Sequence, residues 1–584
     1  MTDWPAERSL TLVGSPAIEL HSNVSCPMRD GVRLATDVYR PASGGPYPVL
    51  LIRLPYDKTQ AESILYAHPA WYARQDYIVV TQDCRGRWNS EGEWYPFRDE
   101  AADGFDTIEW AAKLPGSTGQ VGMYGASYAG ATQLLAASQR PPGLVTICPS
   151  VTASQYYEGW TYNQGALALA FAASWATDLG RDTARRAGND VAFAALTSAF
   201  AQAAAWYAHL PLAEHPPLAG PLTPYFRDWL DHPTYDDYWR RWSIDENYER
   251  LTVPALHVAG WYDIFLSGSV KNFLGMQDGS GSAAARAGQK LIIGPWMHIP
   301  WVPADGSVDV TASSTVVDDW QIAWFDHFLK GKESGVLDAP VTVYVLNQNQ
   351  WRDFDAWPPS HAVSTNYFLH SQGRANAAHG DGRLTLEPPA AEPVDLFTYD
   401  PDIPIPSLGG HSCCFATVAP MGPASQAPIE ALNSVLVYTS EPVEQAIDII
   451  GDVSVTLYAA STAVDTDWTA RLCQVDPNGT SINLQEGIVR ARYRDSLSEP
   501  SPIEPNQVYE YAIPLGPVGV RILAGHRLRL LIASSDFPQW DRNLNTGGPL
   551  FQEGPTTAQV ATQTIFHDEQ HPSHLTLSML PVNA

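Results

Sequence analysis

Short apolar segments and longer amphipathic segments alternate along much of the chain. The apolar segments are 48–53, 77–81, 121–124, 144–147, 253–259 and 290–294. Helical composition or spacing marks 99–114, 129–137 and 321–329. Apolar strands without polar alternation are buried on both faces, which is typical of a parallel sheet covered by helices on each side. The pattern therefore predicts an α/β domain.

Two other patterns divide the rest of the chain. Between about 153 and 249 the sequence is rich in alanine and aromatic residues and shows no strand signal, and the α/β pattern resumes after it. From about 357 onward, short alternating strands are separated by Pro and Gly turns. We therefore predict an α/β domain formed by 1–152 and 250–356, a helical insertion at 153–249 placed as a lid, and a β-sandwich jelly-roll domain at 357–584.

Composition narrows the class of protein. At 584 residues, with 45% hydrophobic residues and 20 Trp, the chain is long enough for several well-packed cores. A formal net charge of −28 disfavours nucleic acid and anionic membranes as partners. The first residues lack a basic start followed by an apolar stretch, and no apolar run is long enough to span a bilayer. We expect a cytoplasmic protein that acts on a small molecule, with a homo-oligomer left open.

The cysteines indicate neither a disulfide scaffold nor a zinc site. They are Cys26, Cys84, Cys148, Cys413, Cys414 and Cys473. Six cysteines in a chain of this length are too sparse for a scaffold, and the C-x-x-C spacing of zinc sites is missing. We therefore expect reduced structural thiols and no metal.

The candidate chemistry is centred on residues 120–130, QVGMYGASYAG. Here a predicted buried strand reaches a sharp turn at Ser127, which lies between small residues and just before a helical segment. Glycine tolerates the strained backbone of such a turn, and small flanking residues let strand and helix approach closely. A serine raised above the sheet edge at a helix start is suited to nucleophilic attack. An ordinary Gly/Ser turn is the alternative that this motif alone leaves open.

A serine nucleophile needs a base, and the base needs an orienting acid. The strand 253–259 leads to Asp263, and the strand 290–294 leads to His298. Ser127, Asp263 and His298 follow the chain order of nucleophile, acid and base in this type of site. Open α/β sheets also place their sites at the carboxyl ends of strands. Taken singly, Asp263 is equally a turn residue and His298 a surface histidine, but their shared context favours a triad.

Five segments together resemble a known family. They are LPYDK (54–58), DCRGRWNSEGEW (83–94), GASYAG (125–130), GWYDIF (260–265) and GPWMH (294–298). With these motifs the chain resembles the X-Pro dipeptidyl-peptidase/cocaine esterase family of serine hydrolases, which also includes α-amino-acid ester hydrolases and some β-lactam acylases. The resemblance covers most of the chain. It implies an α/β-hydrolase domain with a helical lid and a C-terminal β jelly roll.

The resemblance also implies roles for individual residues. Ser127 would be the nucleophile, His298 the general base and then acid, and Asp263 its orienting partner. The sequence has no HGGG-type loop to supply a second oxyanion donor. In this family a tyrosine of the LPYDK-type loop supplies its hydroxyl, which points to Tyr56, together with the backbone N–H of Tyr128.

The predicted pocket rests on weaker grounds. Trp160 and Trp175 match the lid tryptophans that line the acyl pocket of the family's esterase member, and Phe265 matches a third wall. An aromatic slot would favour an aromatic or bulky apolar acyl group. All three side chains are equally interpreted as core aromatics of the lid. The segment 410–415 is a further candidate wall, and the loop 83–85 is expected to brace the site through an ion pair.

We therefore predict a serine hydrolase that cleaves carboxylic esters through an acyl-enzyme. An amide-acting member of the family is the alternative, namely an X-Pro dipeptidyl-peptidase, an α-amino-acid ester hydrolase or a β-lactam acylase. The amino-acid ester hydrolases need a carboxylate cluster for the substrate ammonium, for which the lid acids Glu158, Asp178 and Asp182 are candidates. A carbohydrate-binding protein with an inactive turn is the third possibility. No metal or organic cofactor is expected.

Overall fold

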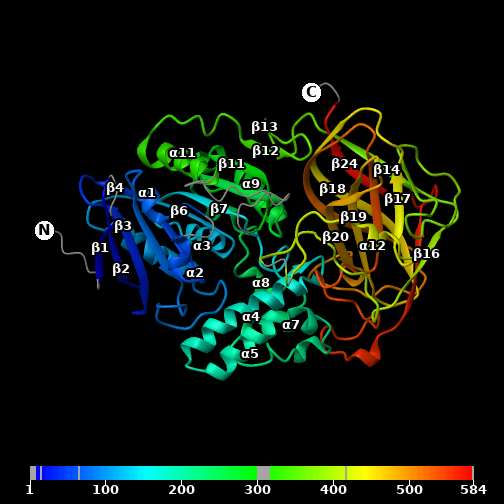
Figure 1. The fold of residues 1–584 in the computed structure, drawn as a ribbon, viewed down its shortest axis with the longest axis horizontal. Helices are drawn as coiled ribbons and strands as arrows, with labels where there is room; N and C mark the ends of the chain where they lie inside the picture. The colour runs from blue at the N-terminus through cyan, green and yellow to red at the C-terminus, as the bar shows by residue number, and fades with distance from the viewer. Residues whose placement is uncertain are drawn as a thin grey trace.

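The computed structural model describes residues 8–12, 16–62, 66–298, 316–414, 417 and 419–581. Within these residues the chain forms two 11-stranded sheets and a small two-stranded sheet. Figure 1 shows the first large sheet with its helices at one end of the molecule and the second large sheet at the other, with a group of helices beside both. This is the predicted α/β-hydrolase architecture with a C-terminal all-β domain.

In the described chain, seven neighbouring strands of the first sheet run parallel. Their spatial order is β5 (Ile78–Asp83), β4 (Tyr47–Leu54), β6 (Ser117–Ala126), β7 (Leu144–Ser150), β10 (Ala255–Tyr262), β11 (Gln289–Met297) and β12 (Val341–Val345). Antiparallel strands flank them, namely β1 (Arg8–Leu12), β2 (Ile18–Pro27), β3 (Arg33–Pro41) and, on the other edge, β13 (Gln350–Phe354). The strands predicted from apolar runs are confirmed, and their carboxyl ends meet along one edge of the sheet.

Helices cover both faces of this sheet. They are α1 (Pro69–Ala73), α2 (Glu100–Ala112), α3 (Tyr128–Ala137), α9 (Leu266–Gly279) and α11 (Val316–Lys330). β4 shows why its sequence is continuously apolar: Val49 and Leu51 enter the core with α2 and α3, whereas Leu50 and Ile52 enter the core with α1 and α11. All four side chains are at most 4% exposed. Full burial of such a side chain contributes roughly 1.5–3 kcal/mol to folding.

Five α-helices occupy the described segment between β7 and β10. They are α4 (Leu169–Arg186), α5 (Asp190–Ala201), α6 (Ala203–Tyr207), α7 (Pro224–Asp231) and α8 (Asp237–Arg240). Asn189 caps α5 by accepting a hydrogen bond of 3.0 Å from the backbone N–H of Ala192. Contrary to the prediction of no strands here, β8 (Tyr162–Asn163) pairs with β9 (Ala166–Leu167). Strands of two residues are too short to show an alternating pattern.

The second large sheet belongs to the C-terminal part of the chain. Its strands are β14 (Val363–His370), β15 (Arg383–Thr385), β16 (Asp395–Tyr399), β17 (Leu436–Ser440), β18 (Ile447–Ser461), β19 (Asp467–Val475), β20 (Ser481–Arg490), β21 (Tyr509–Ile522), β22 (Arg527–Ala533), β23 (Ala561–Phe566) and β24 (His574–Met579). Within β18, Val453, Val455 and Leu457 point into the core. The jelly-roll topology and the domain boundaries stay predictions.

The C-terminal β domain packs directly against the end of β10. The indole N–H of Trp261 donates to the carbonyl of Tyr344 at 2.5 Å, and the backbone N–H of Leu346 donates to the carbonyl of Gly519 at 2.9 Å. Gly519 has to lack a side chain, because a Cβ there would lie 2.2 Å from the Trp261 ring. The strand end that precedes Asp263 is therefore fixed between two domains.

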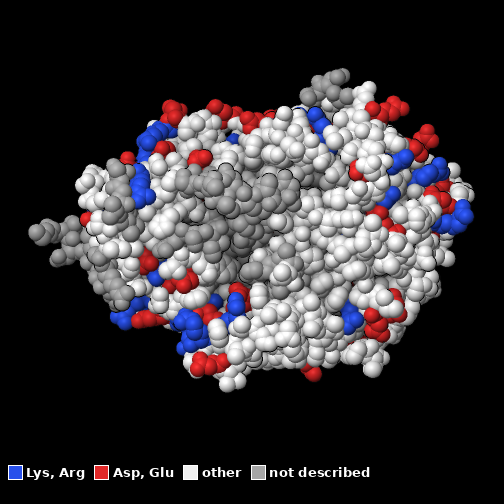
Figure 2. All heavy atoms as spheres, in the orientation of Figure 1, with Lys and Arg blue, Asp and Glu red and all other residues white. Residues whose placement is uncertain are grey.

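The surface agrees with a strongly acidic chain. Figure 2 shows acidic and basic side chains mixed around the periphery of one face, with few on the described part of its centre. The formal net charge is −28.

Among the described helices, none combines the length and the hydropathy that crossing a membrane would require.

Candidate active site

Ser127 occupies a sharp turn between β6 and α3. Its backbone has φ 60° and ψ −124°, a conformation that L residues rarely adopt. Gly125 precedes it with φ 142°, and a Cβ there would lie 2.7 Å from the Cβ of Ala129. A Cβ on Gly130 would lie 2.7 Å from the Cβ of Thr152. Glycines on both sides are therefore what allows strand and helix to meet at this serine.

Hydrogen bonds join Ser127, His298 and Asp263 in one buried chain. Ser127 Oγ lies 3.0 Å from His298 Nε2, and His298 Nδ1 lies 2.6 Å from Asp263 Oδ1. Each residue is at most 6% exposed. β10 and β11 are adjacent and parallel, with Tyr262 opposite Met297, so the next residue of each strand emerges at the same place. A carboxylate that accepts the Nδ1–H leaves Nε2 free to accept a serine proton.

The Tyr56 hydroxyl is available as a hydrogen-bond donor. It follows β4 and accepts a hydrogen bond of 3.0 Å from the indole N–H of Trp175. An indole N–H only donates, so this bond leaves the tyrosine proton free for another acceptor. Burial raises the pKa of Tyr56 to about 12, against the hydrogen bonds with Trp175 and Ser127 that favour the phenolate. The hydroxyl therefore keeps its proton at neutral pH.

The backbone N–H of Tyr128 lies at the start of α3, while its side chain is held by hydrogen bonds. Tyr128 is the first residue of α3, so no carbonyl one turn earlier accepts its N–H. Its hydroxyl donates to Glu100 Oε1 at 3.0 Å and accepts from the backbone N–H of Phe97 at 2.8 Å. Glu100 is paired with the buried Arg53 at 3.0 Å. Sequence reasoning missed this network, for which an arginine at the end of an apolar strand was a signal.

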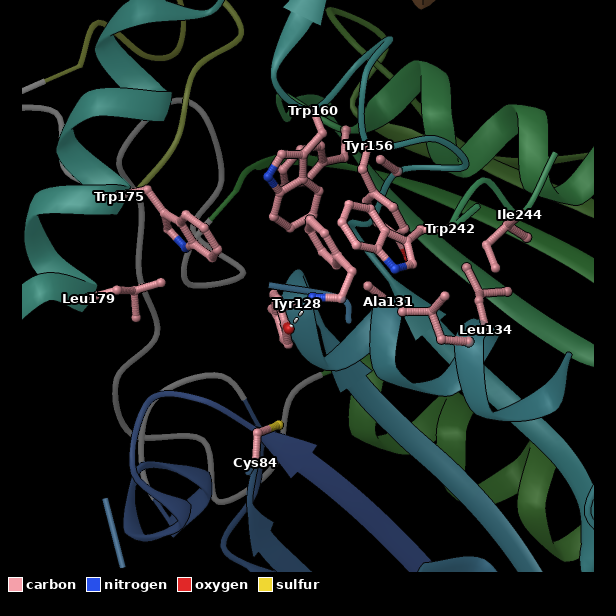
Figure 3. Packing of buried hydrophobic residues seen from close by; sticks show 14 of the residues in the cluster. Cys84, Tyr128, Ala131, Leu134, Tyr156, Trp160, Trp175, Leu179, Trp242 and Ile244 are labelled. Atoms are coloured by element: carbon pink, nitrogen blue, oxygen red, sulfur yellow. Dashed lines mark hydrogen bonds between the residues drawn. The ribbon is translucent and has the colours of Figure 1, made fainter. Parts of the chain in front are cut away.

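A cavity of about 510 Å³ opens beside Ser127. Apolar and aromatic side chains make up much of its wall, including Ile52, Leu54, Tyr56, Tyr66, Ala126, Ala129, Trp175 and Leu179. Of the three predicted pocket aromatics, Trp175 lines this cavity. Trp160 instead stacks on Phe265 with ring centroids 4.4 Å apart, and Phe265 meets the His298 ring edge-on at 5.2 Å. Figure 3 shows Trp160 and Trp175 extending towards Tyr128.

The acidic residues that line this cavity are ion-paired. Asp178 contacts Arg181 on the same helix. Asp182 lies 3.4 Å from the buried Arg87 and 2.6 Å from Arg185. The third predicted acid of the lid, at position 158, lines a different cavity and accepts hydrogen bonds from Gln164. No cluster of unpaired carboxylates is therefore found around Ser127 in the described chain.

The loop 83–85 supports the segment that carries Tyr56. Asp83 Oδ1 accepts a hydrogen bond of 2.6 Å from the backbone N–H of Lys58, and its Oδ2 lies 4.0 Å from the Lys58 ammonium. Arg85 pairs with Asp103 at 2.6 Å, on the far side of the loop. Asp83 therefore braces the segment after Tyr56 through the backbone hydrogen bond from Lys58, whereas the Lys58 ammonium lies nearer to Asp37, at 3.4 Å. An ion pair from this loop that braces the site stays a prediction.

Two cysteines differ from the expected reduced state. Cys413 and Cys414 form a disulfide, whereas the other four thiols are free and buried. Adjacent cysteines can pair only where the backbone bends, and Cys414 has φ 100°. Cys414 lines the cavity beside Ser127, and the expected wall residue 415 lies outside the described residues. His298 lies close to both sulfurs in a group with metal-ligand spacing, but bonded sulfurs are not the thiolates that bind metals.

The fold and the site geometry define an α/β-hydrolase with a buried Ser–His–Asp arrangement. Residues 30–300 match the X-Pro dipeptidyl-peptidase (S15 family) profile, and residues 334–576 match the X-Pro dipeptidyl-peptidase C-terminal non-catalytic domain. The chain is 38% identical over 576 residues to cocaine esterase of Rhodococcus sp. (strain MB1 Bresler), across 96% of this chain and 98% of that protein. The chain therefore belongs to the S15 X-Pro dipeptidyl-peptidase family and is a serine hydrolase acting on esters or peptides.

Solved structures share the whole architecture. An aminopeptidase from the marine sediment archaeon Thaumarchaeota archaeon is similar with a TM-score of 0.78 and 24% identity, covering 95% of both chains. An α-amino acid ester hydrolase is similar with a TM-score of 0.77 and 24% identity, covering 99% of both chains. At these identities the likeness concerns the fold, that is, the α/β-hydrolase domain followed by an all-β domain.

Proposed function

We propose that this protein hydrolyses carboxylic esters of a bulky or aromatic acyl group through an acyl-enzyme on Ser127. The observation that carries the proposal is the buried chain from Ser127 Oγ through His298 to Asp263, with steps of 3.0 and 2.6 Å. The mainly apolar cavity beside Ser127, with Trp175 in its wall, supports a large apolar acyl group. The 38% identity to a cocaine esterase supports ester chemistry.

The reaction follows from the positions of the polar atoms. Ser127 Oγ attacks the ester carbonyl carbon while His298 Nε2 takes the serine proton. The negative charge that develops on the carbonyl oxygen is stabilised by the Tyr56 hydroxyl and the Tyr128 N–H. His298 then returns the proton to the departing alcohol, which leaves the acyl group on Ser127. Water activated by the same imidazole releases the acid and restores the serine.

The charges around the cavity support ester over aminopeptidase chemistry. A carboxylate without a cationic partner would favour binding of a substrate ammonium, but the cavity acids Asp178 and Asp182 are already paired with arginines. Matched p-nitrophenyl esters and anilides, with and without an α-amino group, test the proposal directly. We expect esters of aromatic acids without an amino group to be turned over fastest. Faster turnover of α-amino anilides would instead assign the protein to peptide chemistry.

Replacing Tyr56 with Phe tests the oxyanion donor, because the ring stays and only the hydroxyl is removed. Loss of one such donor costs about 10²–10³ in kcat, or roughly 3–4 kcal/mol. The loss should be in kcat rather than KM, because the oxyanion exists only in the transition state and the tetrahedral intermediate. Steady-state kinetics on one aromatic ester measure it.

Tyr72→Phe is the matched control for this variant. Its hydroxyl is also buried and hydrogen-bonded, but to Asp318 and Gln321 rather than at the site. We expect Tyr72→Phe to lower the melting temperature and leave kcat near wild type. Retention of more than about a third of kcat by Tyr56→Phe would show that this tyrosine is structural, since an oxyanion donor contributes far more.

Trp175→Phe tests whether the lid orients Tyr56. The substitution keeps an aromatic ring in the cavity wall and removes the 3.0 Å hydrogen bond to the Tyr56 hydroxyl. A net hydrogen bond of about 1 kcal/mol corresponds to a fall in kcat of about three- to tenfold. Trp160→Phe is the comparison, because the Trp160 indole N–H has no hydrogen-bond partner in the described part of the chain. An equal fall in both variants would mean that ring size, and not the hydrogen bond, sets the rate.

A further inference from the structure

A buried histidine of the β domain contacts the strand end that carries Asp263. His411 Nδ1 lies 2.9 Å from Glu486 Oε1, and His411 Nε2 lies 2.7 Å from the backbone carbonyl oxygen of Trp261. The side chains of His411 and Glu486 are 12% and 1% exposed. Glu486 Oε1 also accepts the backbone N–H of His411 at 2.6 Å. The pair thus links β20 of one domain to β10 of the other.

The two contacts fit an imidazole that carries a proton on each nitrogen. A carboxylate oxygen and a backbone carbonyl oxygen both accept hydrogen bonds and donate none. A neutral imidazole has one N–H, so one of its nitrogens would present a lone pair to an acceptor. Gly410 allows the close approach: it has φ 110°, and a Cβ there would lie 2.6 Å from Glu486 Oε1. The site is therefore built around an imidazolium ion.

A short piece of backbone connects the Trp261 carbonyl, which His411 contacts, to Asp263 of the proposed triad. Trp261 is two residues before Asp263, and the Asp263 N–H donates to the carbonyl of Gly260 at 3.1 Å. The ring of Tyr262 lies on the imidazole, with centroids 5.7 Å apart and an interplanar angle of 22°. Among the described residues Asp263 Oδ2 has no hydrogen-bond partner, so its carboxylate is oriented by His298 and by the backbone that His411 holds.

We propose that His411 is a positioning residue for the triad: as an imidazolium between Glu486 and the Trp261 carbonyl, it fixes the end of β10 and so the direction of the Asp263 carboxylate. The inference rests on the proposed triad and extends it to the β domain. In this account the domain that the family describes as non-catalytic supplies a charge that aligns the catalytic acid. In the described chain, no hydrogen bond or ring contact joins His411 to Ser127 or to the imidazole of His298.

The account predicts a pH dependence. Burial opposes the charge on His411, but Glu486 and the Trp261 carbonyl outweigh it and raise the pKa of His411 above its ordinary value of 6.5. His411 in turn lowers the pKa of Glu486 to about 2, although burial acts the other way. Because the folded-state pKa of His411 is raised, its contribution is complete below about 6.5 and is lost as pH rises through the raised value.

Other charged and titratable groups surround this pair. They are Asp263 after β10, Arg471 of β19 with its partner Asp536, Lys271 of α9 with its partner Asp245, and Glu158 of the lid. Burial raises the pKa of Glu158 to about 7, so this group also titrates near neutral pH. A step in the rate profile that belongs to Glu158 would not respond to removal of the charge on Glu486.

The test is the pH profile of kcat for an aromatic p-nitrophenyl ester between about pH 5.5 and 9.5. We expect wild-type kcat to fall about tenfold or more on the alkaline side, since small misplacements of catalytic groups cost up to about 10²-fold. The kcat of His411→Gln should already equal this lower value at neutral pH, and its pH profile should show no alkaline step. Its KM should stay within about twofold of the wild-type KM. Glu486→Gln should move the step to lower pH, because His411 then lacks its carboxylate partner.

His567→Gln is the matched control. His567 Nε2 lies 2.9 Å from Asp395 Oδ2 in the same domain, and neither side chain is exposed. Within the described residues, the hydrogen bonds and ion pairs of these two side chains stay in the β domain. We expect His567→Gln to reduce the melting temperature and to keep the wild-type pH profile. Folding of every variant is checked by circular dichroism, and kcat is normalised to the fraction labelled by a fluorophosphonate.

Defined results overturn the proposal. A His411→Gln protein with wild-type kcat, or with the alkaline step still present, shows that His411 does not position the triad. A loss that His567→Gln reproduces shows a general effect on the β domain and equally refutes it. If Glu486→Gln does not fold, the pH profile of His411→Gln alone decides whether the proposal stands. Failure of the wild type itself to be labelled at Ser127 would contradict the proposed function instead.

Discussion

Ser127→Ala should abolish ester hydrolysis while leaving the fold intact. The serine has φ 60° at the turn, a conformation set by the surrounding strand and helix rather than by its hydroxyl. In a comparable triad, removal of the nucleophile costs about 10⁶ in kcat. Initial rates at saturating ester measure the loss of hydrolysis, and a circular dichroism spectrum shows whether the fold is intact.

A second serine on the same helix provides the control for this variant. Ser138 ends α3 and donates from its hydroxyl to the carbonyl of Leu135 at 2.7 Å, away from the site. Ser138→Ala should keep wild-type kcat and fluorophosphonate labelling, whereas Ser127→Ala should lose both. Turnover by Ser127→Ala above about 1% of wild type would point to another nucleophile, because the expected residual rate is far lower.

Asp263→Asn should reduce kcat by about 10⁴. The carboxylate accepts the proton on His298 Nδ1 at 2.6 Å. An amide can present its N–H₂ group instead, which favours the tautomer with the proton on Nε2. That tautomer cannot accept a proton from Ser127 at 3.0 Å. The loss is measured by comparing Asp263→Asn with the wild type in kcat and in the rate of fluorophosphonate labelling. We expect both quantities to fall.

Asp245→Asn separates this effect from the general cost of removing a buried carboxylate. The Asp245 side chain is 7% exposed and pairs with Lys271 at 2.6 Å. We expect this substitution to affect stability and leave labelling of Ser127 near wild type. If Asp263→Asn lost no more activity than Asp245→Asn, the acid of the triad would have to be another residue.

The parts that the sequence could predict are those set by local backbone geometry. The turn at Ser127 was visible because glycine at 125 and 130 is needed wherever strand and helix approach so closely. Asp263 and His298 were found because continuous apolar strands indicate a parallel sheet, and parallel strands end along one edge. The position of a residue relative to the end of a strand can be read along the chain, so a single sequence is enough to predict it.

Contacts between distant segments could not be predicted in this way. The indole of Trp175 donates to Tyr56, 119 residues away, and its ring orientation depends on how the lid packs. His411 reaches the carbonyl of Trp261 across 150 residues. Asp178 and Asp182 pair with arginines, which their positions in the sequence did not indicate. Composition and spacing do not specify which side chains meet across domains.

The expected cysteine chemistry failed for a related reason. Spacing rules exclude scaffolds and zinc motifs, but they are silent about two adjacent cysteines. Cys413 and Cys414 form a disulfide, and the backbone at Cys414 has φ 100°. That bend lies in the segment between β16 and β17, whose sequence has no hydrophobic periodicity from which the bend could be predicted.

The most direct test of the account is titration of the wild-type protein with a fluorophosphonate, followed by peptide mass spectrometry and by assay of residual activity on an aromatic ester. The account predicts one phosphonyl group per chain, attached to Ser127, and a loss of hydrolysis in proportion to labelling. Labelling at another residue, or full hydrolysis by protein that is fully labelled at Ser127, would contradict it.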